Sequence, residues 1–117
     1  MLDSIVASKS FDFATNIINL CRELSIYKKE TVLSKQLLRS GTSIGANVRE
    51  ALKGQSRRDF LSKMYIALKE ANEAEYWLEL LIATNYLDKQ KGKEILEQCR
   101  EVCKILNSIV KTTRMKK

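Results

Sequence analysis

The chain contains no proline and only four glycines among its 117 residues. Because proline and glycine are the residues that most often interrupt helices, their scarcity favours long helices over the whole length. Apolar residues recur at spacings of three and four, which is the period of a helix buried on one side. We therefore predict an all-α fold, with helices at about residues 4–26, 31–52, 56–85 and 91–113.

The connections between these segments are short, and short connections place neighbouring helices antiparallel. The predicted architecture is an antiparallel up-down-up-down four-helix bundle. A chain of 117 residues fits a single domain, which we assign to residues 1–117. Thr31 is the expected N-cap of the second helix and Ser56 that of the third, because a hydroxyl oxygen can accept a free backbone N–H.

The second segment is the candidate for the innermost helix. One apolar line runs along it, within about 40° when residues are placed at 100° intervals. The line consists of Leu33, Leu37, Gly41, Ile44, Val48 and Ala51. Since each glycine inside a helix costs about 1 kcal/mol against alanine, some close contact must offset that cost. We expect Gly41 and Gly45 to be such contacts, where a neighbouring helix touches the backbone.

The third segment carries more apolar surface than one buried face can use. Outside its main apolar arc lies a second flank of five large residues, namely Tyr65, Ile66, Tyr76, Trp77 and Leu80. A helix that is apolar nearly all round is buried on more than one side. We predict that this flank is an oligomer interface, in which contacts between two different faces close into a ring. The alternative is a set of scattered surface aromatics, which are common on folded proteins.

The inventory of side chains argues against an enzyme. The chain has no histidine, the commonest general base and metal ligand. Its cysteines, Cys21, Cys99 and Cys103, are expected to be buried and reduced, so we predict no metal site and no cofactor. Glu75 lies within the apolar arc and needs a partner. We expect it to join Asn47 and a basic residue in a polar cluster that fixes helix register; a catalytic carboxylate is the alternative.

No run of apolar residues approaches the roughly 20 that a transmembrane helix needs. The first residues also lack the basic start and apolar core of a secretion signal. We therefore expect a cytoplasmic protein with no membrane partner.

Positive charge is the main functional signal. The chain has 21 basic and 14 acidic residues, a net charge of +7, and its acidic third helix lies between two basic regions. The candidate nucleic-acid-binding residues are Lys35, Arg39, Arg49, Lys53, Arg57, Arg58, Lys93, Arg100, Lys104 and Lys111. Eight of them form two stripes, one on the second helix and one on the fourth. The first stripe is Lys35, Arg39, Arg49 and Lys53, opposite the apolar line, and the second is Lys93, Arg100, Lys104 and Lys111. Stripes of this kind suit salt-sensitive phosphate contacts and recognition of RNA or DNA by shape. The alternative is a protein–protein scaffold whose charged helix faces are simply solvated.

Two runs of the sequence, LSKQLLRSGTSIGANVREA and QSRRDFLSKMYIALKEANEAEYWLELL, resemble the bacterial four-helix-bundle proteins also called 23S rRNA intervening-sequence proteins. The resemblance covers about residues 10–112. It is most specific over Arg39–Gly41 and Asn47–Glu50, followed by Asp59-Phe60 and the glutamate-rich third helix. Many members have Glu-Gly in the turn after the second helix. Here Glu50 is followed by Ala51, and Gly54 comes later, which implies a slightly longer second helix.

The resemblance implies an antiparallel four-helix bundle that assembles as a cyclic homopentamer. Some members of that family are encoded in insertions within rRNA genes. A related branch is the accessory protein of diversity-generating retroelements, a basic pentameric barrel that binds nucleic acid and a reverse transcriptase. Homo-oligomerisation, structured RNA or DNA and, within that branch, a reverse transcriptase are therefore the implied partners.

Overall fold

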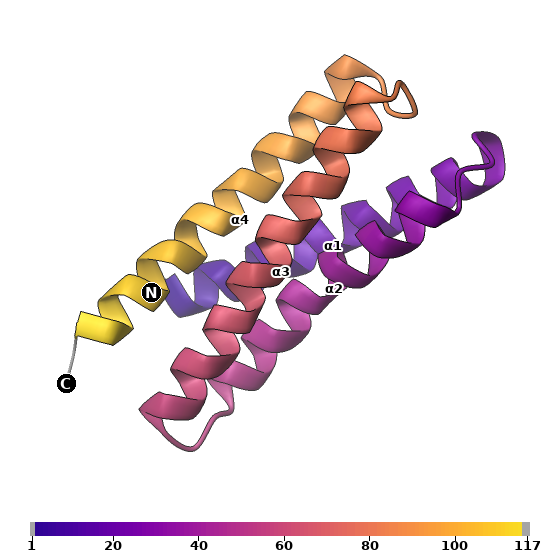
Figure 1. The fold of residues 1–117 in the computed structure, drawn as a ribbon. Coiled ribbons are helices and arrows are strands. Elements are labelled where there is room, and N and C mark those ends of the chain that lie inside the picture. The colour runs from indigo at the N-terminus through magenta and orange to yellow at the C-terminus, as the bar shows by residue number, and fades with distance from the viewer. Residues whose placement is uncertain (1, 116–117) are drawn as a thin grey trace.

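The structure is a computed structural model that describes residues 2–115, and these residues form four α-helices without a strand (Figure 1). The helices are α1 (Leu2–Tyr27), α2 (Val32–Leu52), α3 (Arg57–Ala83) and α4 (Lys89–Met115). The all-α prediction is confirmed. None of the helices in this part of the chain has the length and apolar character that a membrane span requires.

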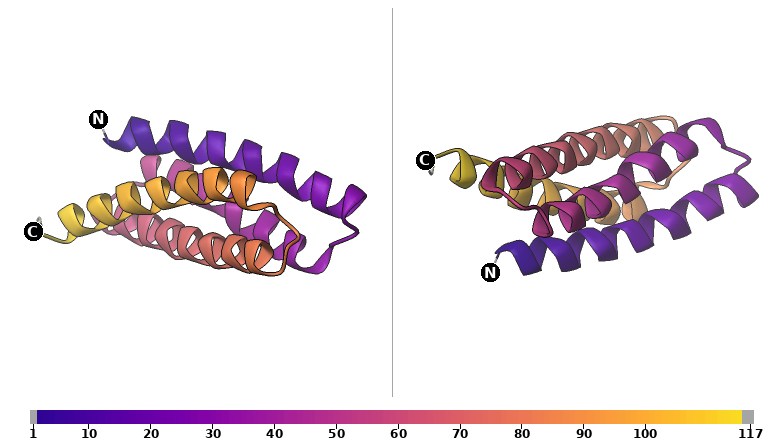
Figure 2. Two further views of the ribbon diagram at one scale, coloured as in Figure 1. Left: turned by 90° about the horizontal axis from the view of Figure 1, so that it is seen from above. Right: turned by 90° about the horizontal axis from the view of Figure 1, so that it is seen from below.

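The helices form an elongated bundle with extents of 48 × 20 × 19 Å. Helix α1 begins, and helix α4 ends, at the end of the bundle that carries the α2–α3 turn. The α1–α2 and α3–α4 turns lie at the opposite end (Figures 1 and 2). This is the predicted up-down-up-down arrangement. Helix α1 packs on α2 and α4, and α3 packs on the same two helices, whereas the diagonal pairs are not in close contact over the described residues. Because α2 and α4 are diagonal, their outward faces point in opposite directions.

The core fills the space between the four helices. Its largest fully buried side chains come from every helix and include Phe13, Ile17, Leu37, Ile44, Met64, Leu78, Leu81 and Leu106. The apolar line of α2 faces this core from Leu37 to Ala51, while Leu33 is half-buried at its start. The side chains of Ser10, Ser34 and Ser40 are buried too. Each hydroxyl donates to the backbone carbonyl of a residue three or four positions earlier in the chain.

The helical glycines differ in how closely a neighbouring helix approaches them. A Cβ atom added at Gly41 would lie 2.9 Å from Cγ2 of Ile17 on α1, whereas one added at Gly45 would lie 3.5 Å from Oγ of Ser10. The tightest approach is at Gly92, where a Cβ would lie 2.6 Å from Cγ1 of Ile82. Gly92 therefore lies inside α4 and lets α3 pack against the first turns of that helix.

Thr31 and Ser56 occupy the predicted N-cap positions of α2 and α3, but only the Ser56 hydroxyl acts as the predicted acceptor. The Thr31 side chain makes no capping hydrogen bond. Instead the Glu30 carboxylate accepts three backbone N–H groups of the first turn, with donor–acceptor distances from 2.8 to 3.2 Å. Glu30 precedes Thr31 by one residue, but its side chain is longer and still reaches these N–H donors. At α3, the backbone N–H of Asp59 donates to Oγ of Ser56 at 3.0 Å.

Candidate nucleic-acid interface

The structure does not bring the ten candidate basic residues into one surface. All ten are exposed. Those of α2 and those of α4 lie on outward faces that point in opposite directions, because the two helices are diagonal in the bundle. A rigid duplex lying against one face of a single subunit would therefore meet one stripe and not the other.

Arg39 of the α2 stripe is paired within the chain. Its guanidinium donates to Glu70 of α3 at 3.1 Å and also forms an ion pair with Glu73. These carboxylates, Glu73 first, raise the pKa of Arg39, and its charge is locally balanced. Trp77 donates its indole N–H to the same Glu73 carboxylate at 3.0 Å. That hydrogen bond is the main reason why the pKa of Glu73 is lowered.

Arg100 of the α4 stripe is paired in the same way. Its guanidinium contacts Glu75 at 2.7 Å and Glu79 at 3.1 Å, both on α3. The basic partner predicted for Glu75 is therefore Arg100. The prediction that Asn47 joins this cluster is wrong, because Asn47 Nδ2 donates to the Ser43 carbonyl within α2. Glu75 instead faces α4, where Arg100 meets it.

Four of the candidate cations gather around the α2–α3 turn. We call them the basic turn: Arg49, Lys53, Arg57 and Arg58. Within residues 2–115 none of them forms an ion pair, and the nearby Glu50 is engaged by Lys63 at 3.1 Å. Between residues 49 and 63 the chain carries five basic and two acidic side chains, so the basic turn is a locally positive end of the bundle.

Lys104 and Lys111 of α4 border a shallow hollow of about 500 Å³ between α3 and α4. Asn72 and Asn107 line the same hollow, but so does Glu75. The carboxylate and its partner Arg100 make the floor of this hollow nearly neutral. It is a weaker candidate for phosphate contacts than the basic turn.

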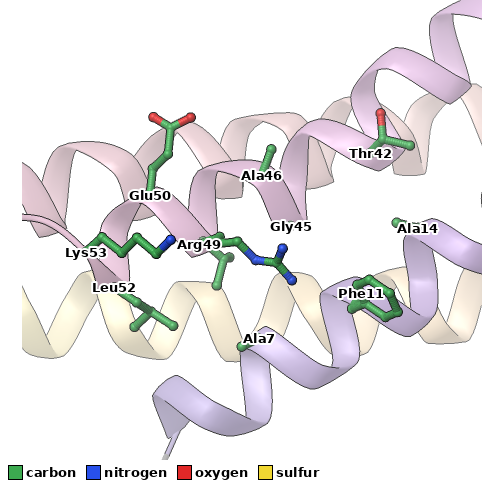
Figure 3. Close-up of a pocket in the computed structure, with 11 residues that line it drawn as sticks. Ala7, Phe11, Ala14, Thr42, Gly45, Ala46, Arg49, Glu50, Leu52 and Lys53 are labelled. Carbon is green, nitrogen blue, oxygen red and sulfur yellow. The ribbon is translucent and has the colours of Figure 1, made fainter.

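A second hollow, of about 460 Å³, lies between the outward sides of α1 and α2 (Figure 3). Its walls are small or apolar, with Ala7 and Phe11 on α1 and Ala46 on α2, and the side chains of Arg49 and Lys53 reach along one end. A shallower hollow of about 310 Å³ continues the line past Ile18 and Leu38. We call the two together the α1–α2 groove.

The flank predicted as an oligomer interface lies on the outward side of α3. Tyr65 is 43% exposed, Tyr76 is 54% exposed and Ile66 is also exposed. Trp77 and Leu80 are half-buried. The rings of Tyr76 and Trp77 are tilted against each other with centroids 5.3 Å apart. The guanidinium of Arg114, on α4, lies 5.4 Å above the ring of Tyr65.

Comparison with known proteins assigns the chain to a family. The family described as 23S rRNA-intervening sequence protein matches residues 2–108. The chain belongs to this family. A similar solved structure is a protein of unknown function from the S23 ribosomal protein family of Bacteroides thetaiotaomicron, with 55% sequence identity and a TM-score of 0.93. The match covers 95% of this chain and 99% of that one. Among curated proteins, none matches.

The three cysteines of this family member are buried and not disulfide-bonded. Burial, together with the Glu30 carboxylate, raises the pKa of Cys21 to about 12, and its thiol donates to the Ser34 carbonyl at 3.2 Å. The pKa of Cys99 is raised by a hydrogen bond with Cys103 and by burial. Over residues 2–115 no three acidic or cysteine side chains are grouped as metal ligands would be.

Sequence reasoning missed the α1–α2 groove. The signal was present in α1, where Ala7 and Ala14 are seven residues apart with Phe11 between them. Such spacing marks one helix face. An outward face of small residues is hard to distinguish from a buried one, however, until the neighbouring helix is placed.

Proposed function

We propose that this member of the 23S rRNA-intervening sequence protein family is a non-enzymatic, self-associating bundle that binds the backbone of structured RNA or DNA. The basic turn is the contact surface. The observation that carries this proposal is that Arg49, Lys53, Arg57 and Arg58 are exposed at one end of the bundle and unpaired within the described residues, whereas Arg39 and Arg100 are engaged by carboxylates.

The chemistry of the basic turn suits phosphate groups more than bases. Lysine and arginine at a solvated turn release condensed counterions when they neutralise phosphates, and such contacts carry no sequence information. The family's description names ribosomal RNA, and the similar structure comes from a family named for a ribosomal protein. A structured RNA is therefore the first ligand to test.

The test measures the affinity for a fluorescent RNA hairpin at 50 and 200 mM salt. If four phosphates are neutralised, the logarithm of affinity falls with the logarithm of salt with a slope of about −3, and binding weakens by about 50- to 150-fold. The variant Arg57→Glu/Arg58→Glu should lose most of this affinity. Its fold should persist, because acidic residues are favourable at a helix N-terminus.

The matched control is Lys104→Glu/Lys111→Glu, which reverses the same number of charges on α4. It should bind RNA nearly as well as the parent protein. If the control loses affinity and the Arg57/Arg58 variant does not, the contact surface is the α4 stripe. Affinity that does not change with salt would exclude phosphate contacts altogether.

Self-association is the second part of the proposal, and the α3 flank supports it. Trp and Tyr are typical anchors of interfaces, and Tyr76 and Trp77 lie next to each other on a solvated face. Light scattering should give a mass several times 13.4 kDa, five times for a pentamer. Trp77→Ala should shift the mass towards the monomer. A parent protein that is monomeric at micromolar concentration would contradict this part.

A protein–protein scaffold is the second candidate function. It is favoured by the ion pairs of Arg39 and Arg100 with α3, since each pair removes net positive charge from a predicted stripe. The RNA experiment separates the two candidates: a scaffold self-associates and shows no salt-dependent RNA binding. A reverse transcriptase remains a proposed partner for proteins of the retroelement branch.

A further inference from the structure

Four large apolar side chains are exposed to solvent along the α1–α2 groove. Phe11 is 59% exposed, Ile18 41%, Leu38 38% and Leu52 41%. They lie along one seam, where α1 and α2 pack against each other. Single exposed apolar residues are normal on a protein, but a contiguous series indicates a surface that binds another surface.

The floor of the groove consists of small residues. Ala7 and Ala14 come from α1, and Gly45 and Ala46 come from α2. In Figure 3 the Phe11 ring lies on one side of this floor and the Arg49 side chain extends along it from the opposite helix. A depression between two helices that is lined by small side chains suits the ridge of a third helix, which inserts its large side chains there.

Positive charge surrounds the groove. Arg49 and Lys53 line one end, and Arg22 and Lys35 line the other. Within the described residues none of these four cations forms an ion pair, and the acidic Glu50 at the rim is already engaged by Lys63. The groove therefore favours a helix that carries carboxylates beside its apolar ridge.

The outward side of α3 has this combination. Large side chains, with Tyr76 and Trp77 at the centre, stand among the glutamates of a segment that has five acidic residues and one basic residue between positions 64 and 88. We propose that the α1–α2 groove receives the outward flank of α3 from a second copy of this chain. This proposal rests on the self-association proposed above and names the face that receives the flank.

The groove is long enough to receive the flank. The flank from Tyr65 to Leu80 extends about 22 Å along α3 at 1.5 Å per residue. On α2 the groove extends from Lys35 to Lys53, about 27 Å at the same rise. Because the flank and the groove are different faces of one chain, each copy offers both, and the contact can repeat around a closed ring.

Trp77 can be buried in such an interface without losing its hydrogen bond. A buried indole N–H needs an acceptor, and Trp77 already donates to Glu73 within its own chain at 3.0 Å. Its ring can therefore be covered by the alanine-lined floor without leaving an unsatisfied donor.

Arg39 and Arg100 each bridge two glutamates of α3, so four carboxylates face two guanidinium groups and a negative excess remains. The groove cations meet this excess, and Arg57 and Arg58 of the basic turn stay outside the groove, where they can contact nucleic acid.

The test is complementation between two variants that each lose one face. Ala46→Glu puts bulk and negative charge on the floor of the groove, and Tyr76→Glu puts a carboxylate where the ridge meets that floor. Both sites are exposed, so both variants should fold, which circular dichroism checks. Gln36→Glu is the matched control, because it adds the same charge to an exposed position of α2 outside the groove.

Each variant alone should sediment as a 13.4 kDa monomer. An equimolar mixture should form a dimer of twice that mass, because the intact groove of the Tyr76 variant receives the intact flank of the Ala46 variant. The Gln36 control should keep the mass of the parent protein.

Three results would overturn the proposal. If Ala46→Glu keeps the parent mass, the groove is not the receiving face, although self-association still stands. If both variants are monomeric and the mixture remains so, the flank pairs with another surface. If the parent protein itself is monomeric, self-association fails, and the assignment of the groove fails with it.

Discussion

Two glycines of α2, Gly41 and Gly45, should respond differently to replacement by alanine. Alanine is favoured over glycine inside a helix by about 1 kcal/mol. At Gly45 the added Cβ would lie 3.5 Å from Oγ of Ser10, an ordinary contact. We therefore expect Gly45→Ala to increase the free energy of unfolding by about 1 kcal/mol.

At Gly41 the same methyl group has no room. Its Cβ would lie 2.9 Å from Cγ2 and 3.1 Å from Cγ1 of Ile17, which is fully buried, so α1 must move. Overpacking of this kind costs about 1–3 kcal/mol, against the gain of about 1 kcal/mol in helix propensity. Gly41→Ala should thus range from neutral to about 2 kcal/mol less stable than the parent protein. Gly41→Leu should lose several kcal/mol.

The measurement is urea unfolding followed by far-UV circular dichroism, with all proteins at one protomer concentration because self-association would make stability concentration-dependent. The two alanine variants should differ by about 1–3 kcal/mol, or about 4–12 °C in Tm for a domain of this size. If Gly41→Ala is stabilised as much as Gly45→Ala, the close approach of α1 to α2 is refuted.

Three further predictions concern single side chains. Glu30→Ala should cost about 1–2 kcal/mol by urea unfolding, because three N–H groups of α2 lose their acceptor; an unchanged midpoint would contradict this cap. The thiol of Cys21, whose pKa is raised to about 12, should react with iodoacetamide at pH 8 far more slowly in the folded protein than in urea, as mass spectrometry would show. The pKa of Glu73 is lowered, so its contribution to stability is present above its unfolded value of about 4.3 and is lost as pH falls further. Glu73→Gln should therefore flatten the acid limb of the stability curve, and an unchanged limb would refute this role.

Much of the fold could be predicted from local sequence. The absence of proline and the three- and four-residue spacing of apolar side chains identify the helices, because these properties depend on the backbone and on one face at a time. Ends were less certain, as Thr31 and Glu30 illustrate. Both precede α2 and both carry an acceptor oxygen, and only the path of the turn decides which side chain reaches the free N–H groups.

The candidate site depended more on tertiary structure. Periodicity places Arg39 and Arg100 on outward stripes of α2 and α4. It does not show which glutamates of the neighbouring α3 form ion pairs with them. Periodicity likewise gives each helix a buried and an exposed side without giving the order of helices around the core. That order sets the two basic stripes on opposite sides, brings Arg39 and Arg100 within reach of the α3 glutamates, and joins the small residues of α1 and α2 into a groove. By itself the sequence determined the helices, the short turns and the excess of apolar surface on α3, since these are properties of single segments. The ion pairs, the groove and the tight contact at Gly92 were decided by packing, because each needs atoms from two helices at one place.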